Sequence, residues 1–205
     1  MTLQYAIIKG LKDVSSDITK SLLENEKPLD IINNRIIPAL NTIGKAFEEK
    51  KAYLPQLLMS ADAASASFEI VKSKIGSSSS DTSRSVILAT VKGDIHDIGK
   101  NIVKVLLESY GFTVYDLGRD VSPDTVCRQV EKTGCRLVGL SALMTTTVPS
   151  MEATIDILRS KYPDVAVMVG GAVLNKEYAD MIKADYYASD AMGAVRISEE
   201  YYSNN

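Results

Sequence analysis

Residues 86–103 read VILATVKGDIHDIGKNIV, and this stretch decides the fold of the larger part of the chain. It begins with an unbroken apolar run, which is typical of a strand buried on both faces of a parallel sheet. A polar loop with two glycines follows, and from Ile98 to Tyr110 apolar residues recur at helical spacing. Strand, loop and helix in this order predict the first half of a βαβ unit.

The same alternation of short apolar strands and amphipathic helices continues to residue 201. The strands are expected at residues 86–90, 112–117, 137–140, 165–169 and 186–188. The helices are expected at residues 98–110, 123–132, 151–161, 176–183 and 191–201. We therefore predict a Rossmann-like, five-stranded parallel sheet flanked by helices. In such sheets ligands bind beyond the carboxyl ends of the strands, so the loops at those ends are the candidate binding loops.

The sequence pattern of residues 1–75 is typical of helices. A stripe of apolar residues at helical spacing predicts the first helix: Ala6, Ile7, Leu11, Val14, Ile18 and Leu22. Pro28 is placed to start a second helix, and Pro38 is expected to kink or split it, because proline clashes with the preceding turn. Further apolar spacing through Phe47 and at residues 57–71 completes four helical pieces, which predict a four-helix bundle.

A stretch of different composition separates these two regions. Residues 76–83 read GSSSSDTS, a composition typical of a flexible linker. The expected organisation is a helical domain at residues 1–76, a linker at residues 77–84 and a Rossmann-like domain at residues 85–205. The predicted class is therefore α plus α/β.

Composition places the chain among ordinary globular proteins. The 205 residues are 45% hydrophobic and 24% charged, with a net charge of −3, so no basic surface for nucleic acid is expected. Cys127 and Cys135 are too few and too widely spaced for a disulfide framework or a CxxC motif, which favours a reducing cytoplasm. The N-terminus lacks a signal-peptide pattern, and the longest apolar stretch, residues 165–174, is too short to cross a bilayer. Neither nucleic acid nor membrane is an expected partner.

The loop after the first strand holds the only histidine of the chain, His96. Imidazole is the most common metal ligand among side chains, and its second nitrogen needs an acceptor that fixes tautomer and orientation. Asp94, two residues upstream, is the candidate acceptor, and Gly93 and Gly99 permit the close approach of a bulky ligand. One histidine and one carboxylate cannot build a tetrahedral zinc site, so a metal here would need a cofactor to supply most of its ligands. A structural or solvated histidine is the alternative.

Two further loops carry small residues. The loop after the third strand offers hydroxyls at Ser141, Thr145, Thr146 and Thr147, which either bind a ligand or cap the next helix. The loop after the fourth strand, GGA at residues 170–172, fits either a simple turn or the close approach of a large ligand. The sequence has no GxGxxG after the first strand, no P-loop motif and no GxSxG, which disfavours dinucleotide, P-loop and α/β-hydrolase sites.

The motif GDIHDIGKNIV at residues 93–103 resembles the B12-binding signature of methionine synthase and of corrinoid methyltransferase proteins. YDLG at residues 115–118, SALMTTT at residues 141–147 and VGGA at residues 169–172 are similar to that family in the corresponding loops. Upstream, residues 47–59, which include FEE and YLPQLLM, resemble the helical cap that precedes the B12 domain in that family. The resemblance covers nearly the whole chain and implies a helical cap followed by a Rossmann-like cobalamin-binding domain.

The resemblance also implies roles for individual residues. His96 would be the lower ligand of cobalt in place of the cofactor's own dimethylbenzimidazole, an arrangement called base-off/His-on. Asp94 would accept the other imidazole proton, and Thr147 would complete the relay where methionine synthase has a serine. Glu49 of the cap would approach the upper face of the corrin ring. Other loop residues would contact the cofactor, those from residue 141 onward its displaced nucleotide tail: Gly93, Ile95, Asp97, Gly99, Ser141, Thr145, Gly170, Gly171, Ala172 and Ala191.

The function that the resemblance implies is that of a methyl carrier. The cofactor would be cobalamin, as methylcobalamin and cob(I)alamin. A substrate-specific methyltransferase would load the methyl group, an acceptor methyltransferase would pass it to tetrahydrofolate or a thiol, and a reductive activator would restore oxidised cobalt. Two other classes are similar. B12-dependent sensors or light-responsive regulators resemble the pair of cap and B12 domain, and small subunits of adenosylcobalamin mutases share the loop signature but lack this cap. An α/β domain that has lost cofactor binding is the remaining alternative.

Overall fold

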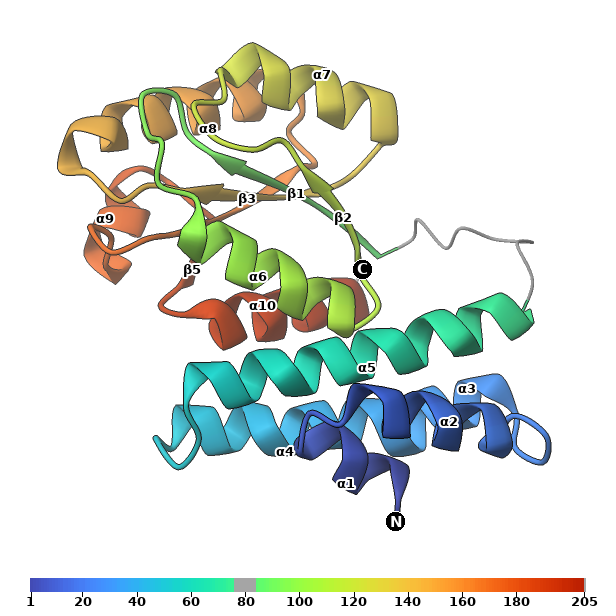
Figure 1. Cartoon of the computed structure of the whole chain (residues 1–205). Coiled ribbons are helices and arrows are strands. Elements are labelled where there is room, and N and C mark those ends of the chain that lie inside the picture. Colours follow the sequence, from blue (N-terminus) through green and yellow to red (C-terminus); the bar gives the residue numbers. More distant parts are fainter. Residues whose placement is uncertain (76–83, 205) are drawn as a thin grey trace. The chain divides into compact units, whose positions relative to one another are not determined.

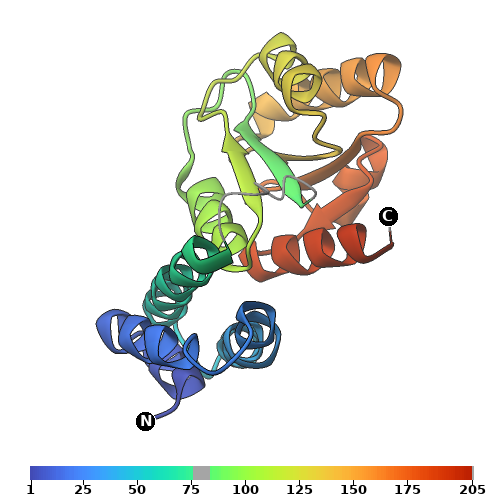
Figure 2. The same ribbon diagram turned by 90° about the vertical axis from the view of Figure 1, so that its right-hand side faces the viewer.

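The computed structural model describes residues 1–75 and 84–204. They form two compact units: one contains the N-terminal helices with Val105–Gly111, and the other contains the sheet with the remaining helices (Figure 1, Figure 2). The linker predicted at residues 77–84 lies outside the described residues except for Arg84. The domain boundaries proposed from the sequence therefore stay predictions.

In its described residues the N-terminal unit is helical. Its elements are α1 (Leu3–Ile8), α2 (Lys12–Leu22), α3 (Pro28–Ile31), the π-helical turn η1 (Ile32–Ile36), α4 (Ile37–Glu48) and α5 (Leu54–Ile75). The core of the unit is formed by apolar side chains from most of these elements, among them Leu3, Ile7, Ile31, Ile36, Leu40 and Leu57. Although α5 has 22 residues, neither it nor any other described helix is long and apolar enough to cross a membrane.

The prediction of a single first helix is wrong, because two helices form there. Ala6 and Ile7 of the predicted stripe are buried in α1, but the stripe is not the buried face of α2. Gly10 adopts a φ of +67°, in the left-handed region, just after the end of α1. Leu11 and Val14 are 37% and 38% exposed. Ser15 and Thr19 are fully buried instead, and their hydroxyls donate to backbone carbonyls at 2.7–3.1 Å. These satisfied hydroxyls provide the small surface with which α2 packs on α5.

Pro38 does not split the second helical run. The run passes from α3 through η1 into α4, and Pro38 lies in the first turn of α4. Just before it, the N–H of Ile37 bonds to the carbonyl of Ile32, as in a π-helix. A widened turn accommodates the proline, so the irregularity at this point is a local change of helix type.

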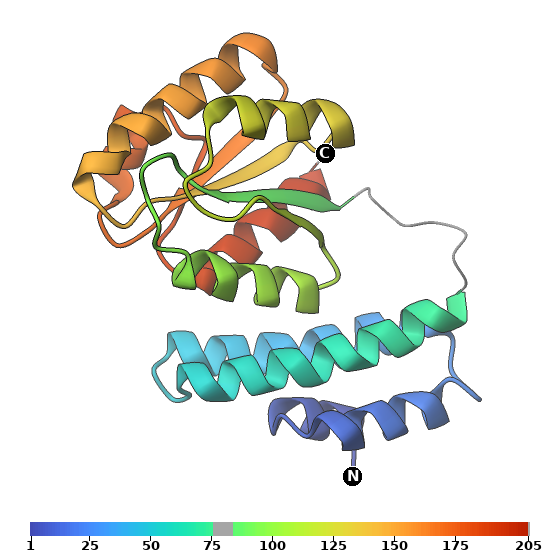
Figure 3. The same cartoon turned by 45° about the horizontal axis from the view of Figure 1, so that its top comes forward.

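The second unit is built on a five-stranded sheet in which all strand pairs are parallel. The strands are β1 (Ser85–Thr90), β2 (Thr113–Asp116), β3 (Leu137–Ser141), β4 (Ala166–Gly170) and β5 (Tyr186–Ala188). The helices are α6 (Ile98–Ser109), of which this unit contains the part up to Lys104, and α7 (Pro123–Thr133), α8 (Val148–Lys161), α9 (Lys176–Met181) and α10 (Ala191–Asn204). Helices α7 and α8 lie on one face of the sheet, and α6 and α10 lie on the other (Figure 1, Figure 3). The predicted Rossmann-like sheet is confirmed.

The strand order places the binding edge of the sheet. The order is β2-β1-β3-β4-β5, and every residue of β1 is buried, as its unbroken apolar run predicts. Because β1 lies between β2 and β3, the chain leaves β1 toward one side and later crosses to the other. This reversal opens a crevice beyond the carboxyl ends of β1 and β3. The loop with His96 and the serine/threonine loop both begin there.

Tyr202 fastens the C-terminal helix to the start of β1. Its hydroxyl donates to the carbonyl of Ser85 at 2.5 Å, and its ring packs edge-on against Tyr201 with a centroid distance of 5.0 Å. Burial raises the pKa of Tyr202 from its ordinary value of 10.0 to about 12. The folded state therefore favours the neutral phenol.

We expect Tyr202→Phe to remove part of the destabilisation of the protein by alkali. The unfolded chain ionises this tyrosine near pH 10, so its stabilising contribution is intact below pH 10 and is lost as the pH rises toward 12. Between pH 8 and pH 11 the free energy of unfolding should fall by about 0.5–1 kcal/mol more in the wild type than in the variant. Urea denaturation at both pH values measures the difference, and equal losses in the two proteins would contradict it.

Candidate functional site

The loop that joins β1 to α6 folds around the carboxylate of Asp94, which is fully buried. Gly93 adopts a φ of +85°, which favours glycine, and the N–H of Asp94 donates to the carbonyl of Val91 at 3.0 Å. Oδ1 of Asp94 accepts from the backbone N–H of His96 and contacts Nδ1 of its imidazole, each at 2.9 Å. The tight turn thus brings the two side chains together.

The other oxygen of Asp94 is held by the loop after β3. Oδ2 accepts from the N–H of Leu143 at 2.7 Å, from the hydroxyl of Thr147 at 3.0 Å and from the N–H of Met144 at 3.3 Å. Burial alone would raise the pKa of this carboxyl, but the donors from His96, Leu143 and Thr147 hold the pKa well below its usual range. Asp94 is therefore a charged acceptor that ties two loops together.

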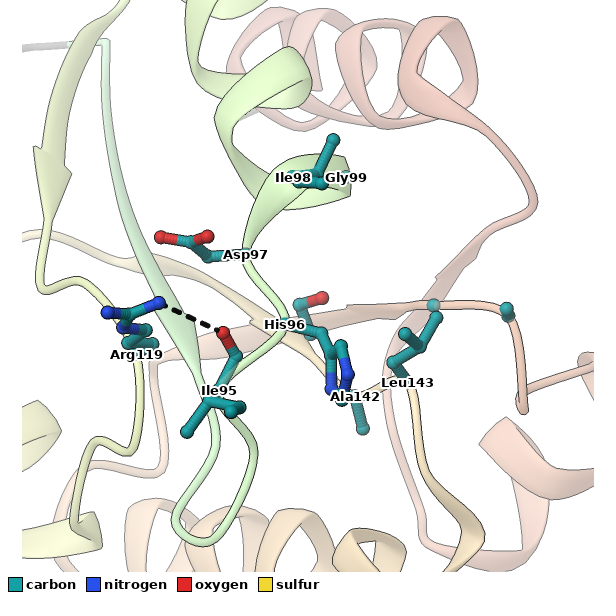
Figure 4. Close-up of a pocket in the computed structure, with 11 residues that line it drawn as sticks. Ile95, His96, Asp97, Ile98, Gly99, Arg119, Ala142 and Leu143 are labelled. Atoms are coloured by element: carbon teal, nitrogen blue, oxygen red, sulfur yellow. Dashed lines mark hydrogen bonds between the residues drawn. The ribbon is translucent and has the colours of Figure 1, made fainter.

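His96 presents one ring nitrogen to a pocket. A carboxylate accepts hydrogen bonds and does not donate them, so Nδ1 of His96 carries the proton that points at Asp94. Nε2 then has the free lone pair, the form in which imidazole binds a metal. The side chain is 46% exposed, and its ring is turned toward Ala142 and Leu143 (Figure 4). The contact with Asp94 fixes both the tautomer and the direction of the ring.

The pocket has a volume of about 530 Å³ and is formed by loops at the carboxyl edge of the sheet. Four loops supply its lining: Ile95, His96, Asp97, Ile98, Gly99, Arg119, Ser141, Ala142, Leu143, Gly171 and Ala172. Three apolar side chains of this lining are well exposed, Ile98 at 77%, Ile95 at 61% and Leu143 at 41%. Large apolar side chains that remain exposed around a recess indicate a surface that an apolar ligand covers.

Gly171 allows the loop after β4 to approach the loop after β3. Its φ is +131°, and a Cβ at this position would lie 1.8 Å from the carbonyl oxygen of Ala142. The N–H of Ala142 donates to the carbonyl of Gly170 at 3.2 Å. Glycine at residue 171 is therefore required by the close packing of two backbones, and this packing brings Ala172 into the same lining as Ser141.

The predicted site residues fall into several groups. Seven line the pocket: Ile95, His96, Asp97, Gly99, Ser141, Gly171 and Ala172. Three support the loop of His96: Gly93, Asp94 and Thr147. Three lie outside this lining, at the start of the turn η2 (Thr145–Thr147), at the end of β4 and at the start of α10: Thr145, Gly170 and Ala191. Glu49 belongs to the N-terminal unit, where its carboxylate pairs with Lys51 at 2.6 Å. The cofactor-binding roles of these residues stay predictions.

Four lining residues are absent from the predicted set: Ile98, Arg119, Ala142 and Leu143. Arg119 lies in the loop after β2, which is one of the candidate binding loops at the carboxyl ends of the strands. Its guanidinium donates to the carbonyl of Ile95 at 3.5 Å (Figure 4). Leu143 acts on Asp94 through its backbone N–H. Because nearly every residue has such a donor, residue type gives no signal for this role.

His96 can supply one ligand to a metal but not a complete metal site. Among residues 1–75 and 84–204, no group of three His, Cys, Asp or Glu side chains is placed to hold a metal ion. A metal at Nε2 must therefore bring most of its own ligands. A macrocycle that carries its own metal would suit this site, because it would bring most of the ligands and His96 could supply one more. The exposed apolar side chains around His96 suit the rim of such a ring.

Comparison with protein families gives two matches along the chain. A model described as B12 binding domain matches residues 84–196, which are the sheet and most of the helices around it. A second model with the same description matches residues 2–72, in the N-terminal helices.

Relatives and solved structures agree with these matches. Dimethylamine corrinoid protein 1 of Methanosarcina acetivorans is 37% identical over 198 residues, which cover 95% of this chain and 93% of that protein. A corrinoid protein of Desulfitobacterium hafniense is 31% identical over 204 residues, which cover 97% and 94%. A chain of the methanol:cobalamin methyltransferase complex MtaBC from Methanosarcina barkeri has a TM-score of 0.86 at 28% identity, covering 99% of this chain and 79% of that one. The chain therefore belongs to the B12-binding family, as a corrinoid protein of methyltransferase systems with cobalamin as its cofactor.

Proposed function

We propose that this chain binds cobalamin base-off/His-on and carries a methyl group between two methyltransferases. The contact between Asp94 and His96 supports this most strongly, because it leaves Nε2 of the imidazole free at the pocket. A carboxylate that accepts from a ligating histidine also raises the basicity of the other nitrogen. Bound cobalamin supplies the chemistry, a cobalt centre that takes up and releases a methyl group.

The chain's own residues hold and orient the cofactor in this proposal. His96 is the lower axial ligand, while Asp94 and Thr147 keep the proton on Nδ1. Loop residues contact the corrin ring on the side of His96: Gly93, Ile95, Asp97 and Gly99. The displaced nucleotide tail lies along the loops after β3, β4 and β5: Ser141, Thr145, Gly170, Gly171, Ala172 and Ala191. Support comes from the shared lining, since the pocket joins the His96 loop to the β3 and β4 loops.

The proposed partners are three other proteins. A substrate-specific methyltransferase loads the methyl group, and the names of the similar dimethylamine corrinoid proteins and of the methanol:cobalamin methyltransferase complex support a small methylated amine or alcohol as its source. An acceptor methyltransferase passes the group to tetrahydrofolate or a thiol. A reductive activator returns oxidised cofactor to the active state.

Isotope labelling tests the axial ligand directly. The protein is produced with ¹⁵N, loaded with cobalamin of natural isotopic abundance, desalted, reduced to the cobalt(II) state and measured by EPR. An axial nitrogen splits the signal into doublets if it is ¹⁵N and into triplets if it is ¹⁴N. We expect doublets, because the ligand comes from the labelled chain. Triplets would show that the cofactor's own base stays on cobalt, and would overturn the proposal.

The substitution His96→Ala assigns the doublets to a residue. We expect the variant to lose them and to bind cobalamin about 10–100-fold more weakly. Free unlabelled imidazole should restore an axial nitrogen, now seen as triplets. Asp97→Ala is the matched control, because it shortens a neighbouring lining residue that has no bond to cobalt in the proposal, and it should keep the doublets. Doublets that survive in His96→Ala would assign the ligand to another residue.

A further inference from the structure

The loop after β2 is joined to the His96 loop by a row of backbone contacts. Beyond the ends of the strands, Val91 and Val121 still pair in parallel. The N–H of Val121 donates to the carbonyl of Thr90 at 3.0 Å, and the N–H of Asp120 donates to the carbonyl of Asp94 at 2.9 Å. The two loops therefore continue the sheet toward the site.

Asp120 holds the His96 loop with its side chain as well as its backbone. Its Oδ1 accepts from the N–H of Gly93 at 2.8 Å and lies 3.0 Å from Nζ of Lys92. Together with its own N–H on the carbonyl of Asp94, Asp120 bonds the backbone on both sides of the pair Gly93 and Asp94. This pair leads directly into His96.

The backbone of Asp120 is in an unusual conformation. Its φ is +54°, in the left-handed region, which is unfavourable for residues with a Cβ and least so for asparagine and aspartate. Such conformations persist where the surrounding structure holds them, and they cluster at functional sites. Asp120 is not among the residues that line the pocket, so its contacts act on the loop and not on a ligand.

The position of the His96 ring depends on Asp94, which is fixed from two directions. The loop after β3 holds the carboxylate of Asp94 through Leu143, and Asp120 holds its backbone. A carboxylate held at its oxygens alone would leave the backbone of the loop free to shift, and the imidazole would shift with it. A loop that is already in place loses less conformational freedom when its ligand binds.

We propose that Asp120 is a positioning residue for the axial histidine. Through Gly93 and Asp94 it holds the loop so that Nε2 of His96 is in place before cobalamin arrives. This inference rests on the proposed function, because it presupposes that His96 is the lower ligand of cobalt. It adds a residue from the loop after β2 to a site whose other supports come from the loops after β1 and β3.

Three substitutions separate the parts of this role. Asp120→Asn keeps an acceptor oxygen and tolerates the left-handed backbone, Asp120→Gly keeps only the backbone conformation, and Asp120→Ala loses both. Each ¹⁵N-labelled variant is loaded with cobalamin, and two quantities are measured: the fraction of cobalt(II) with a doublet EPR signal, and the rate of cobalamin loss after dilution. We expect Asp120→Asn to match the wild type. Asp120→Gly and Asp120→Ala should show a smaller doublet fraction and lose cobalamin about 10-fold faster.

A second set of proteins separates positioning from general stability. Tyr202→Phe alters the opposite end of β1. The two variants are compared at urea concentrations that leave them equally stable, and there Tyr202→Phe should keep the doublets while Asp120→Gly loses part of them. Lys92→Met removes the exposed ion pair and should resemble the wild type. Wild-type behaviour of Asp120→Gly, or equal losses in Asp120→Asn and Asp120→Gly, would overturn this inference and leave the proposed function intact. Triplets in the labelled wild type would overturn the proposed function itself.

Discussion

Asp94→Asn is expected to lower the free energy of unfolding by about 2–4 kcal/mol at pH 7. Both carboxylate oxygens of Asp94 are buried and accept hydrogen bonds, from His96 on one side and from Leu143 and Thr147 on the other. An amide replaces one acceptor by an NH₂ group, which faces donors and leaves them without a partner. Urea denaturation of the cofactor-free protein measures the loss. Asp97→Asn in the same loop is the control and should change the free energy by less than about 0.5 kcal/mol.

The effect of Asp94→Asn should depend on pH in a defined direction. The pKa of Asp94 is lowered by folding, so its contribution is complete above the unfolded value of 3.8 and is lost as the pH falls toward the folded value. The difference between wild type and variant should therefore be smaller at pH 3 than at pH 5. A difference that stays the same at pH 3 would mean that the folded protein does not favour the charged carboxylate.

Gly171→Ala is expected to be the most destabilising single-methyl change in the site, at about 3–5 kcal/mol. Its Cβ would lie 1.8 Å from the carbonyl oxygen of Ala142, and its φ of +131° is unfavourable for alanine. The backbone of one loop must move, so the pocket should also lose its affinity for cobalamin. Urea denaturation and retention of cobalamin on a desalting column measure the two effects.

Gly134→Ala separates the two causes of that loss. Gly134 has a φ of +67°, but a Cβ there would meet nothing within 4 Å. This variant should lose only about 1 kcal/mol, the amount for a left-handed alanine, and should retain cobalamin normally. Equal losses in Gly134→Ala and Gly171→Ala would show that backbone conformation, and not the contact with Ala142, limits residue 171.

The sheet could be predicted from the sequence because its signals are local. A buried parallel strand is an unbroken apolar run, and β1 is such a run with every residue buried. The buried face of α2 was predicted wrongly because it depends on contacts with another helix. Ser15 and Thr19 are buried because each hydroxyl finds a backbone carbonyl, and a pattern of apolar spacing does not register a buried hydroxyl.

In the site, too, local contacts could be predicted from the sequence and distant contacts could not. His96 and Asp94 are two residues apart, so their contact could be predicted from a single loop. Leu143 binds Asp94 from 49 residues away and through its backbone, and Asp120 bonds Gly93 from 27 residues away. Those contacts depend on the order of the strands and on how far the pairing continues past their ends. Thr147 was predicted as a site residue through the resemblance to a family. Such a resemblance includes contacts between distant residues, because the family shares one fold.

The order in which the chain is synthesised determines when Asp94 can be buried. Its turn is complete once residue 96 has been made, but the hydroxyl of Thr147 lies 53 residues after Asp94 in the chain. Until that part leaves the ribosome, the carboxylate has only the donors of its own loop and is better solvated by water than by protein. Gly171, on which the packing of the β3 loop depends, emerges later still. A nascent chain therefore completes this pocket only after residue 171 has emerged, when its N-terminal helices are already free to fold.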